Sequence, residues 1–582
     1  MRTLRFRSSA FLAFTLTVAA MGGPRHGSAA LSQSPSAQDQ SDVWWKHAVI
    51  YEIYPRSFQD SNGDGIGDLN GITSRLDHLK DLGVDMIWLS PIYPSPQVDF
   101  GYDISDYEAI DPQYGTMADF DRLLDEAKKR NIRICMDMVM NHTSDKHRWF
   151  IESASSRTNP KRDWYIWRDG KSPGQPPNNW LSTFGHSAWQ YDPKTKQYYY
   201  HYFYIQQPDL NWRNPEVQKA MFGAVRFWLD KGVAGFRLDA VPTLFEDPSL
   251  KDEEVQPGTN KFGDPNESTS LQENLPEVHN VMRDLRKLID SYPGNRVLIG
   301  ETYLPNVQEL YKWYGDDRHD ELQLPMDMQV GFINKLDVAE FRKKITDAET
   351  KIGDNQPLFV FDNHDNPRLD YRYGDGKHNT EIERMLAAIL FGSRATALMY
   401  YGDEIGMTTT IPTRVEDVKD PIGKTGWPKE KGRDGERTPM QWDTSKNAGF
   451  TTSDHPWLPV PPDYKTINVA VEKPKSDSLL SWYKRLIALR REVPALHSGK
   501  EMMLNTNDNH VLSWLRQTEG HPPVLIACNF TANPQTVSFN LAQDGVTGKH
   551  PSTLLKSPGA RDPASLDKIQ LPPFGVYIGE VK

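Results

Sequence analysis

A regular alternation of short β-rich runs with amphipathic helical stretches constrains the fold of this chain more than any other feature. Strand candidates lie at residues 48–54, 86–89, 132–138, 235–238, 296–300, 321–324, 358–361 and 397–400. Helical patterns lie between them at 72–82, 117–130, 215–231, 276–291 and 379–391. Such alternation is typical of βαβ units around a parallel sheet. The eight strand candidates therefore predict an α/β fold, a (β/α)8 TIM barrel.

Two segments depart from this rhythm. Residues 141–207 are rich in Trp, Tyr, Asn, Pro and Gly and lack a long helical pattern, which predicts a small domain inserted after the third strand. Beyond a helix at 478–493, short alternating strands at 511–515, 524–529, 536–540 and 575–579 predict a C-terminal antiparallel β-sandwich. We therefore expect the barrel over 44–140 and 208–497, the inserted domain over 141–207, and the β-sandwich over 498–582.

The N-terminus has the layout of a secretory signal. Arg2, Arg5 and Arg7 precede an apolar run at 10–21, and small residues end at Ala30. The run is too short to span a bilayer. We expect a signal peptide over 1–30, a flexible leader over 31–43, and a secreted or periplasmic protein with no membrane anchor.

Charge and cysteine content exclude some classes of partner and of stabilisation. The net charge of −11 argues against a general affinity for nucleic-acid phosphates and favours a neutral substrate. Cys135 and Cys528 are the only cysteines, and each lies in an apolar run far from the other. We expect two buried free thiols rather than a disulfide.

Polar side chains stand at the ends of four predicted strands, where a barrel of this type carries its chemistry. They are Asp137 with Asn141 and His142, Arg237 with Asp239, Glu301, and His364 with Asp365. Any one of them alone is more typical of a strand-end cap or turn. The spacing of all four strand ends together along the chain is the feature that points to an active site.

These segments resemble the four signature regions of the α-amylase superfamily, glycoside hydrolase family 13, and QPDLN at 207–211 resembles a fifth. The resemblance runs from about residue 44 to the end of the chain. Within the family the chain is most similar to α-glucosidases and oligo-1,6-glucosidases, through VIYEIYPRSF, DFGYDISDY, NNWLSTFG and RDGERTPMQWD. DAVPTLFE at 239–246 resembles animal-type maltases.

The resemblance implies a role for each candidate. Asp239 matches the nucleophile, Glu301 the acid/base, and Asp365 the third carboxylate, which grips the sugar hydroxyls. Retaining hydrolysis needs the first two about 5 to 5.5 Å apart. Three neighbouring acids raise one another's pKa, and Arg237, on the same strand face as Asp239, can hold that nucleophile ionised. Further matched substrate-binding positions are Tyr102, Asp103, His142, His364, Phe184, Phe203 and Arg437, with core packing as the alternative for both Phe residues.

The segment DSNGDGIGD at 60–68 provides oxygen donors at the spacing of a calcium loop. The candidate ligands are Asp60, Asn62, Asp64, the carbonyl of Ile66, and Asp68. Gly71 replaces the glutamate that would complete an EF-hand, so the loop is not one. It resembles the structural Ca²⁺ site of bacterial α-glucosidases, with a metal-free turn as the alternative. No organic cofactor is predicted.

These patterns together predict a retaining, exo-acting α-glucosidase that releases terminal glucose from a small oligosaccharide or disaccharide. Ala240 follows the nucleophile, where the resemblance associates Ala or Thr with α-1,4 linkages and Val with α-1,6 linkages. The alternatives are an oligo-1,6-glucosidase and a transglycosylating relative such as a sucrose isomerase, trehalose synthase or glucosyltransferase. A non-catalytic binding homologue, like the heavy chains of amino-acid transporters, is a further one. The sequence leaves the oligomeric state open.

Overall fold

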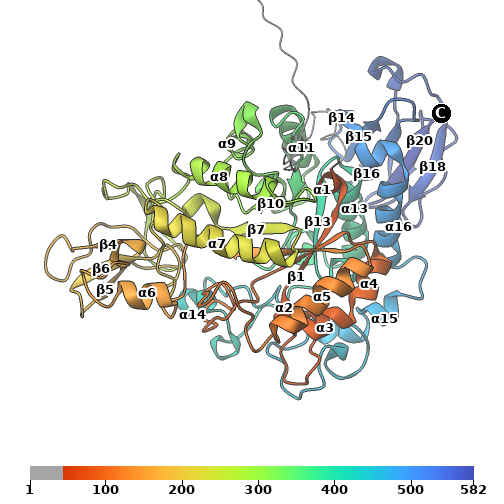
Figure 1. Cartoon of the computed structure of the whole chain (residues 1–582). Coiled ribbons are helices and arrows are strands. Elements are labelled where there is room, and N and C mark those ends of the chain that lie inside the picture. Colours follow the sequence, from red (N-terminus) through yellow and green to blue (C-terminus); the bar gives the residue numbers. More distant parts are fainter. Residues whose placement is uncertain (1–42) are drawn as a thin grey trace, which may run out of the picture. The chain divides into compact units, whose positions relative to one another are not determined.

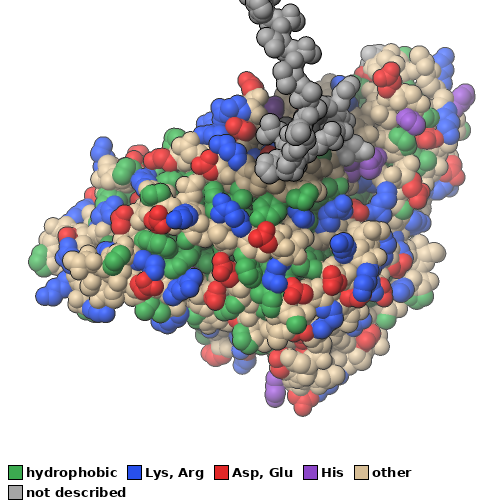
Figure 2. Space-filling view, viewed as in Figure 1, with side chains coloured by type: hydrophobic (Ala, Val, Ile, Leu, Met, Phe, Trp, Pro, Cys, Tyr) green, Lys and Arg blue, Asp and Glu red, His purple; other side chains and the backbone are tan. Residues whose placement is uncertain are grey.

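The computed structural model describes residues 43–582 (Figure 1). The signal peptide predicted for 1–30 and residues 31–42 of the predicted leader lie outside this described part. Within it, no helix is both long and apolar enough to cross a membrane. On the face seen in Figure 2, basic and acidic side chains are interspersed and form no continuous basic patch.

Eight parallel strands form one sheet, in the order β11-β10-β7-β3-β2-β1-β13-β12. Asp327, just after β11, bridges to Phe359 in β12, so that the sheet is nearly closed into a barrel, as predicted. The strands are largely apolar because both of their faces are buried, and Glu52 in β1, Asp137 in β3, and Arg237 and Asp239 in β7 are the buried charged exceptions. Their bounds are β1 (Val49–Ile53), β2 (Met86–Leu89), β3 (Arg133–Val139), β7 (Gly235–Asp239), β10 (Val297–Gly300), β11 (Leu324–Pro325), β12 (Leu358–Phe359) and β13 (Thr396–Tyr400).

Helices cover the outside of the barrel (Figure 1). The longest are α5 (Met117–Lys129), α7 (Pro215–Lys231), α8 (Val278–Asp290), α11 (Val338–Lys351), α13 (Asn379–Gly392) and α16 (Leu479–Glu492). The helix predicted at 72–82 is divided at Arg75, whose ψ of 3° ends α3 (Leu69–Ser74) before α4 (Leu76–Leu82) begins. Helix α11 was not predicted, although Val338, Phe341, Ile345 and Ala348 form a buried stripe at helical spacing.

The segment between β3 and β7 contains a small antiparallel sheet in the order β4-β6-β5. Its elements are α6 (Arg148–Ser153), β4 (Trp167–Arg168), β5 (Trp189–Asp192) and β6 (Gln197–Tyr200). Trp180, Trp189 and Tyr200 pack together in a core of their own. Much of the aromatic content of this segment therefore serves packing rather than sugar binding.

A second extension, between β7 and α8, was not predicted. It carries the hairpin of β8 (Val255–Thr259) and β9 (Pro265–Glu267). The hairpin is hydrogen-bonded to the inserted segment, because Glu267 accepts from the backbone N–H of Leu181 and Asp264 accepts from that of His186.

The C-terminal region contains a five-stranded antiparallel sheet and a two-stranded one, in agreement with the predicted sandwich. Leu515 and Leu525 of the larger sheet share a core with Val537 and Ile569 of the smaller. The strands are β14 (Lys500–Leu504), β15 (Val511–Gln517), β16 (Val524–Asn529), β18 (Pro551–Lys556) and β20 (Val576–Val581), with β17 (Gln535–Val537) and β19 (Ile569–Leu571) in the smaller sheet. Cys135 in β3 and Cys528 in β16 are buried free thiols, as predicted.

Candidate active site

A cavity of about 470 Å³ lies at the carboxyl ends of the barrel strands, the position at which TIM-barrel enzymes hold their catalytic groups. All three predicted catalytic carboxylates line it. Asp239 is the last residue of β7, Glu301 directly follows β10, and Asp365 lies in the loop after β12. The other lining residues include Asp99, Tyr102, His142, Phe184, Phe203, Ala240, Lys261, Glu273, Tyr303, Glu430 and Arg433.

One buried guanidinium holds the carboxylates of this site together. Arg237 is 0% exposed, and its Nη1 lies 2.9 Å from Asp239 Oδ1 and 2.9 Å from Asp137 Oδ2. Its Nη2 forms an ion pair with Glu301 Oε1 at 2.8 Å. Arg237 sits two residues before Asp239, on the same face of β7, and it is paired in register with Asp137 on β3. A single cation therefore faces three carboxylates.

Burial is the largest influence on the pKa of both Glu301 and Asp239. It raises the pKa of Glu301 above its ordinary value, Arg237 opposes this, and the charge of Asp365 adds to it. The pKa of Asp239 is raised in the same way, chiefly by burial and against the effect of Arg237. A raised pKa suits Glu301 as a general acid. The same direction at Asp239 opposes the expectation that Arg237 holds this nucleophile ionised, and the 2.9 Å contact with Arg237 is what favours its anion. Neighbouring carboxylates add to both shifts, and burial is the larger cause.

Asp365 has the opposite character. Its Oδ1 accepts hydrogen bonds from Arg433 Nη1 at 2.9 Å and from Arg437 Nη2 at 2.7 Å. Although burial opposes the change, His364, Arg433 and Arg437 together hold the pKa of Asp365 well below its usual range. Asp365 is therefore a permanent anion that can accept hydrogen bonds from sugar hydroxyls.

The structure corrects the prediction for Asp103. That side chain is 0% exposed and does not line the cavity. Its carboxylate is used within its own loop, where it accepts from Ser95 Oγ and from the backbone N–H groups of Val98 and Asp99. Asp99, four residues earlier, lines the cavity instead and is bonded to Arg433 Nη2 at 2.8 Å.

The prediction for Arg437 is corrected in the same way. Arg437 is 0% exposed and lies behind Asp365, where its Nε also donates to the backbone oxygen of His364 at 2.7 Å. Arg433, four residues earlier, lines the cavity and bonds both Asp99 and Asp365. The pair of Asp99 and Arg433 was missed, although both residues stand inside the motifs that the sequence had singled out.

The remaining predicted residues divide into two groups. Tyr102, His142, Phe184 and Phe203 line the cavity. Burial lowers the pKa of His142 to about 3, so it meets a substrate as a neutral imidazole. His364 does not line the cavity and lies behind Tyr102 and Asp365.

Residues that no motif had indicated form the rim of the cavity. Lys261, on the hairpin of β8 and β9, pairs with Glu430 at 2.6 Å. This contact joins the hairpin to the segment that carries Arg433. Glu273 also lines the rim and is hydrogen-bonded to Tyr202 of the inserted segment. Because these contacts join distant loops, no local sequence pattern could have revealed them.

The predicted calcium loop is built around two buried carboxylates. Asp60 Oδ1 accepts from the backbone N–H groups of Asn62 and Gly63, and Asp68 caps α3. Asp64 is exposed and its Oδ1 accepts from the N–H of Ile66. The donor chemistry fits Ca²⁺. Within residues 43–582, however, no three Asp, Glu, His or Cys side chains converge in the geometry of a metal site, so the loop fits in donor type alone.

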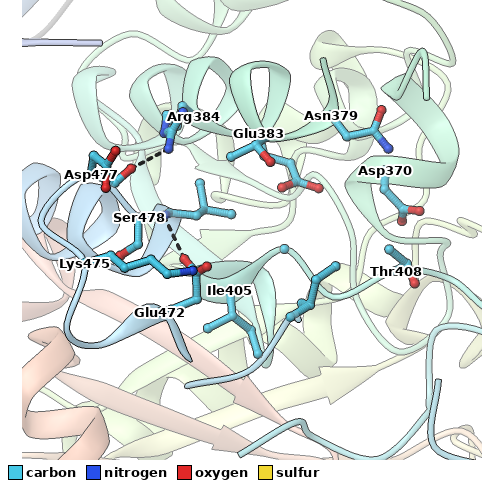
Figure 3. A pocket seen from close by; sticks show the side chains of 14 residues that line it. Asp370, Asn379, Glu383, Arg384, Ile405, Thr408, Glu472, Lys475, Asp477 and Ser478 are labelled. Atoms are coloured by element: carbon cyan, nitrogen blue, oxygen red, sulfur yellow. Dashed lines mark hydrogen bonds between the residues drawn. The ribbon is translucent and has the colours of Figure 1, made fainter. Parts of the chain in front are cut away.

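A second cavity, of about 300 Å³, lies between α13 and the turn before α16 (Figure 3). Asp370, Glu383 and Glu472 line it together with Arg384 and Lys475. It contains no residue from the end of a barrel strand and no aromatic side chain against which a sugar ring could pack. The first cavity is therefore the candidate active site.

Residues 52–499 match the protein family described as "Alpha amylase, catalytic domain". An oligo-1,6-glucosidase of Parageobacillus thermoglucosidasius is 40% identical over 573 residues, covering 93% of this chain and 99% of that protein. Maltase 1 of Drosophila virilis is 41% identical over 532 residues, covering 88% of this chain and 82% of that protein. The crystal structure of the trehalulose synthase MutB of Pseudomonas mesoacidophila MX-45 is similar with a TM-score of 0.86 and 37% identity, covering 93% of this chain and 100% of the other.

The contrast between Asp99 and Asp103 can be tested with one matched pair of variants. We expect Asp99→Asn to lower kcat/KM for an aryl α-glucoside by roughly a hundredfold, because a charged hydrogen-bond acceptor in the cavity is worth about 3 kcal/mol. Asp103→Asn should stay within about tenfold, since its amide oxygen can still accept from the Asp99 N–H and Ser95 Oγ at the Oδ1 position, and only the hydrogen bond from the Val98 N–H to Oδ2 is lost. The measurement is steady-state kinetics on both variants. Equal losses of kcat/KM would contradict the placement of Asp99, rather than Asp103, in the cavity.

Proposed function

The chain belongs to the alpha-amylase family of glycoside hydrolases, and we propose that it is a retaining, exo-acting α-glucosidase. It releases terminal glucose from short α-glucosides. The observation that carries the proposal is the set of carboxylates at one cavity, in which Arg237 contacts Asp239 and Glu301, and Arg433 and Arg437 contact Asp365.

In this proposal Asp239 is the nucleophile and Glu301 the acid/base. Asp239 attacks the anomeric carbon as Glu301 gives its proton to the leaving glycosidic oxygen, and a glucosyl ester forms on Asp239. Glu301, now ionised, takes a proton from water, whose oxygen displaces Asp239 and releases glucose. Arg237 supports both steps, because its cation stabilises each carboxylate in its ionised form.

The boundaries of the cavity support cleavage at the end of a short chain. Asp99, Arg433 and Asp365 form a linked polar group that suits the hydroxyls of one terminal ring. Phe184 and Phe203 give aromatic surface beside it, with ring centroids 5.3 Å apart. Lys261 and Glu430, paired at 2.6 Å, also line the cavity and join the hairpin to the segment that carries Arg433.

We propose a preference for α-1,4 linkages. Ala240 lines the cavity directly after Asp239, and its backbone N–H donates to Glu301 Oε2 at 2.8 Å. Its side chain is therefore beside the bond that Glu301 protonates. The alternatives are preference for α-1,6 linkages, the activity named for the Parageobacillus relative, and glucosyl transfer, which the likeness to a trehalulose synthase favours.

The linkage proposal predicts a higher kcat/KM for maltose than for isomaltose. Ala240→Val should shift the ratio of the two values toward isomaltose by about tenfold, a typical effect of added methyl groups in a substrate pocket. The backbone φ of 43° at Ala240 disfavours a β-branched residue, so part of the variant protein is expected to be misfolded. The ratio of the two kcat/KM values is the right measure, because a smaller amount of folded enzyme lowers both values equally. A wild-type preference for isomaltose would overturn the proposal. Product analysis with concentrated sucrose separates hydrolysis from isomerisation or transfer.

We propose that the loop at 60–68 binds a structural Ca²⁺ ion. Its donors would be the side chains of Asp60, Asn62, Asp64 and Asp68 and the carbonyl of Ile66. The ion would stabilise the fold by screening carboxylates that otherwise depend on backbone N–H groups. Burial of Asp60 and Asp68, which are 6% and 4% exposed, supports a structural rather than a catalytic ion.

Calcium removal tests this proposal through stability. Ca²⁺ at about a hundredfold excess over its Kd should add about 3 kcal/mol to the free energy of unfolding. Chelation should therefore lower the Tm, and Asp64→Asn should abolish the response, because the variant keeps the turn acceptor and loses the charge. Asp106→Asn is the control, since Asp106 is another turn aspartate that accepts from a nearby N–H. A Tm that is unchanged by chelation refutes the calcium site.

We propose export as a secreted or periplasmic protein, on the strength of the basic, apolar and small-residue pattern at 1–30. A neutral disaccharide or short oligosaccharide outside the cytoplasm would be its substrate. The net charge of −11 is compatible with such a neutral partner.

A further inference from the structure

We infer that Glu52 is a positioning residue that donates a hydrogen bond, as a neutral carboxylic acid, to Nδ1 of His364 and so directs the imidazole Nε2–H toward Asp365. The inference rests on the proposed function, since Asp365 is the residue through which it reaches the substrate. It assigns a role to a buried carboxyl group that the chemistry above does not use.

Glu52 is buried beneath the active site. It is the fourth residue of β1 and is 0% exposed. Its Oε1 lies 2.5 Å from Nδ1 of His364. Its Oε2 is buried and, among the described residues, has no hydrogen-bond partner. The side-chain hydrogen bond of this carboxyl group is therefore to the imidazole, and the backbone of His364 is a second, weaker influence on it.

The imidazole of His364 lies nearly parallel to two tyrosine rings. The ring of Tyr54 is 5.7 Å away between centroids with an interplanar angle of 15°, and the ring of Tyr102 is 5.3 Å away with an angle of 11°. Nε2 lies 2.7 Å from the phenol oxygen of Tyr102 and 3.2 Å from Asp365 Oδ2. A ring held in this way has little freedom to turn, so the position of its proton decides how it interacts with Asp365.

The neighbours of Nε2 favour a proton on that atom, because one of them is an anion. Asp365 is ionised and can only accept. The phenol of Tyr102 has a single proton and two neighbours that could accept it, Asp137 Oδ2 at 3.1 Å and a bare Nε2 at 2.7 Å. We assign it to Asp137, because a bare Nε2 would also face the anionic Asp365 at 3.2 Å. A bare Nε2 would place its lone pair against the oxygen of Asp365, whereas an Nε2–H can donate to Asp365 or to the phenol oxygen.

Whether Nδ1 carries a proton then determines whether Glu52 is protonated. A neutral imidazole with its proton on Nε2 has a bare Nδ1, which needs a donor, and Glu52 can be one only if it is protonated. The competing arrangement is an imidazolium facing an ionised Glu52. That arrangement would leave the anionic Oε2 of Glu52 without a donor in a buried site, which is costly.

The charges around the pair favour the neutral arrangement. Burial, Arg437, Arg237 and Arg433 lower the pKa of His364 well below its usual value, against the effect of Asp365. Burial raises the pKa of Glu52 well above its usual value, against Arg237 and aided by Asp365 and Asp137. Both shifts act in the same direction, toward a neutral acid and a neutral imidazole.

This arrangement gives Asp365 a donor for each oxygen. Arg433 and Arg437 hold Oδ1, and the Nε2–H of His364 lies beside Oδ2. Glu52 thereby fixes the plane in which Asp365 meets the sugar hydroxyls. Without a donor on Nδ1, the imidazole can move its proton to Nδ1 and turn a lone pair toward Asp365.

Two substitutions separate the role of the donor from the role of the charge. Glu52→Gln keeps the size and an N–H donor, so we expect kcat/KM to stay within about twofold of wild type, with an unchanged pH profile. Glu52→Met keeps the approximate volume and removes the donor. We expect its kcat to fall roughly ten- to a hundredfold, the usual cost of removing a group that orients an active-site residue.

The result that would overturn the inference is equal loss of activity in Glu52→Gln and Glu52→Met, which would show that the charge is required. Full activity of Glu52→Met would overturn it as well. Folding of each variant is checked by its Tm, and Glu52→Gln keeps the test decisive where Glu52→Met does not fold.

An infrared difference spectrum gives a readout that does not depend on turnover. Wild type minus Glu52→Gln, at neutral pH, should contain the carbonyl stretch of one protonated carboxylic acid. A spectrum with a carboxylate band in its place would refute the neutral acid. Absence of α-glucosidase activity in wild type would overturn the proposed function alone, since the spectrum would still report the proton on Glu52.

Discussion

The buried ion-pair cluster around Arg237 is the interaction on which the rest of this site depends. One guanidinium contacts Asp137, Asp239 and Glu301, which come from β3, from β7 and from the residue after β10. Burying these charges is costly unless each is paired, so the three strands must keep their register for the cluster to exist. The parallel barrel is therefore what allows carboxylates far apart in the sequence to share one cation at the floor of a cavity.

Around this cluster, the same chemical group takes different protonation states according to its surroundings. Glu301 and Glu52 lie in sites where burial favours the neutral acid, whereas two arginines and His364 keep Asp365 ionised. The separation gives one cavity both a proton donor and a fixed anion. The inserted segment and the hairpin of β8 and β9 supply the walls, so the barrel provides the chemistry and the insertions shape the substrate site.

The sequence predicted the barrel and the catalytic carboxylates because both leave local patterns. Apolar runs that end in a polar residue mark strand ends, and strand ends of a parallel barrel meet at one face. Local patterns did not distinguish Asp99 from Asp103, or Arg433 from Arg437, because each pair stands inside one motif. Only tertiary contacts decide which side chain of each pair reaches the cavity. The contact of Lys261 with Glu430 joins segments 169 residues apart and was beyond any such pattern.

Trapping the covalent intermediate distinguishes Asp239, with Glu301 as its acid/base partner, from any other carboxylate that could act as the nucleophile. In Glu301→Gln, α-glucosyl fluoride can still react, because fluoride needs little help to leave, whereas hydrolysis of the ester is slowed. Peptide mass spectrometry should then find one glucosyl unit on the peptide that contains Asp239. A glucosyl unit on another carboxylate would contradict the assignment of Asp239 as the nucleophile. An unlabelled enzyme, together with a wild-type product of inverted anomeric configuration, would contradict the retaining mechanism.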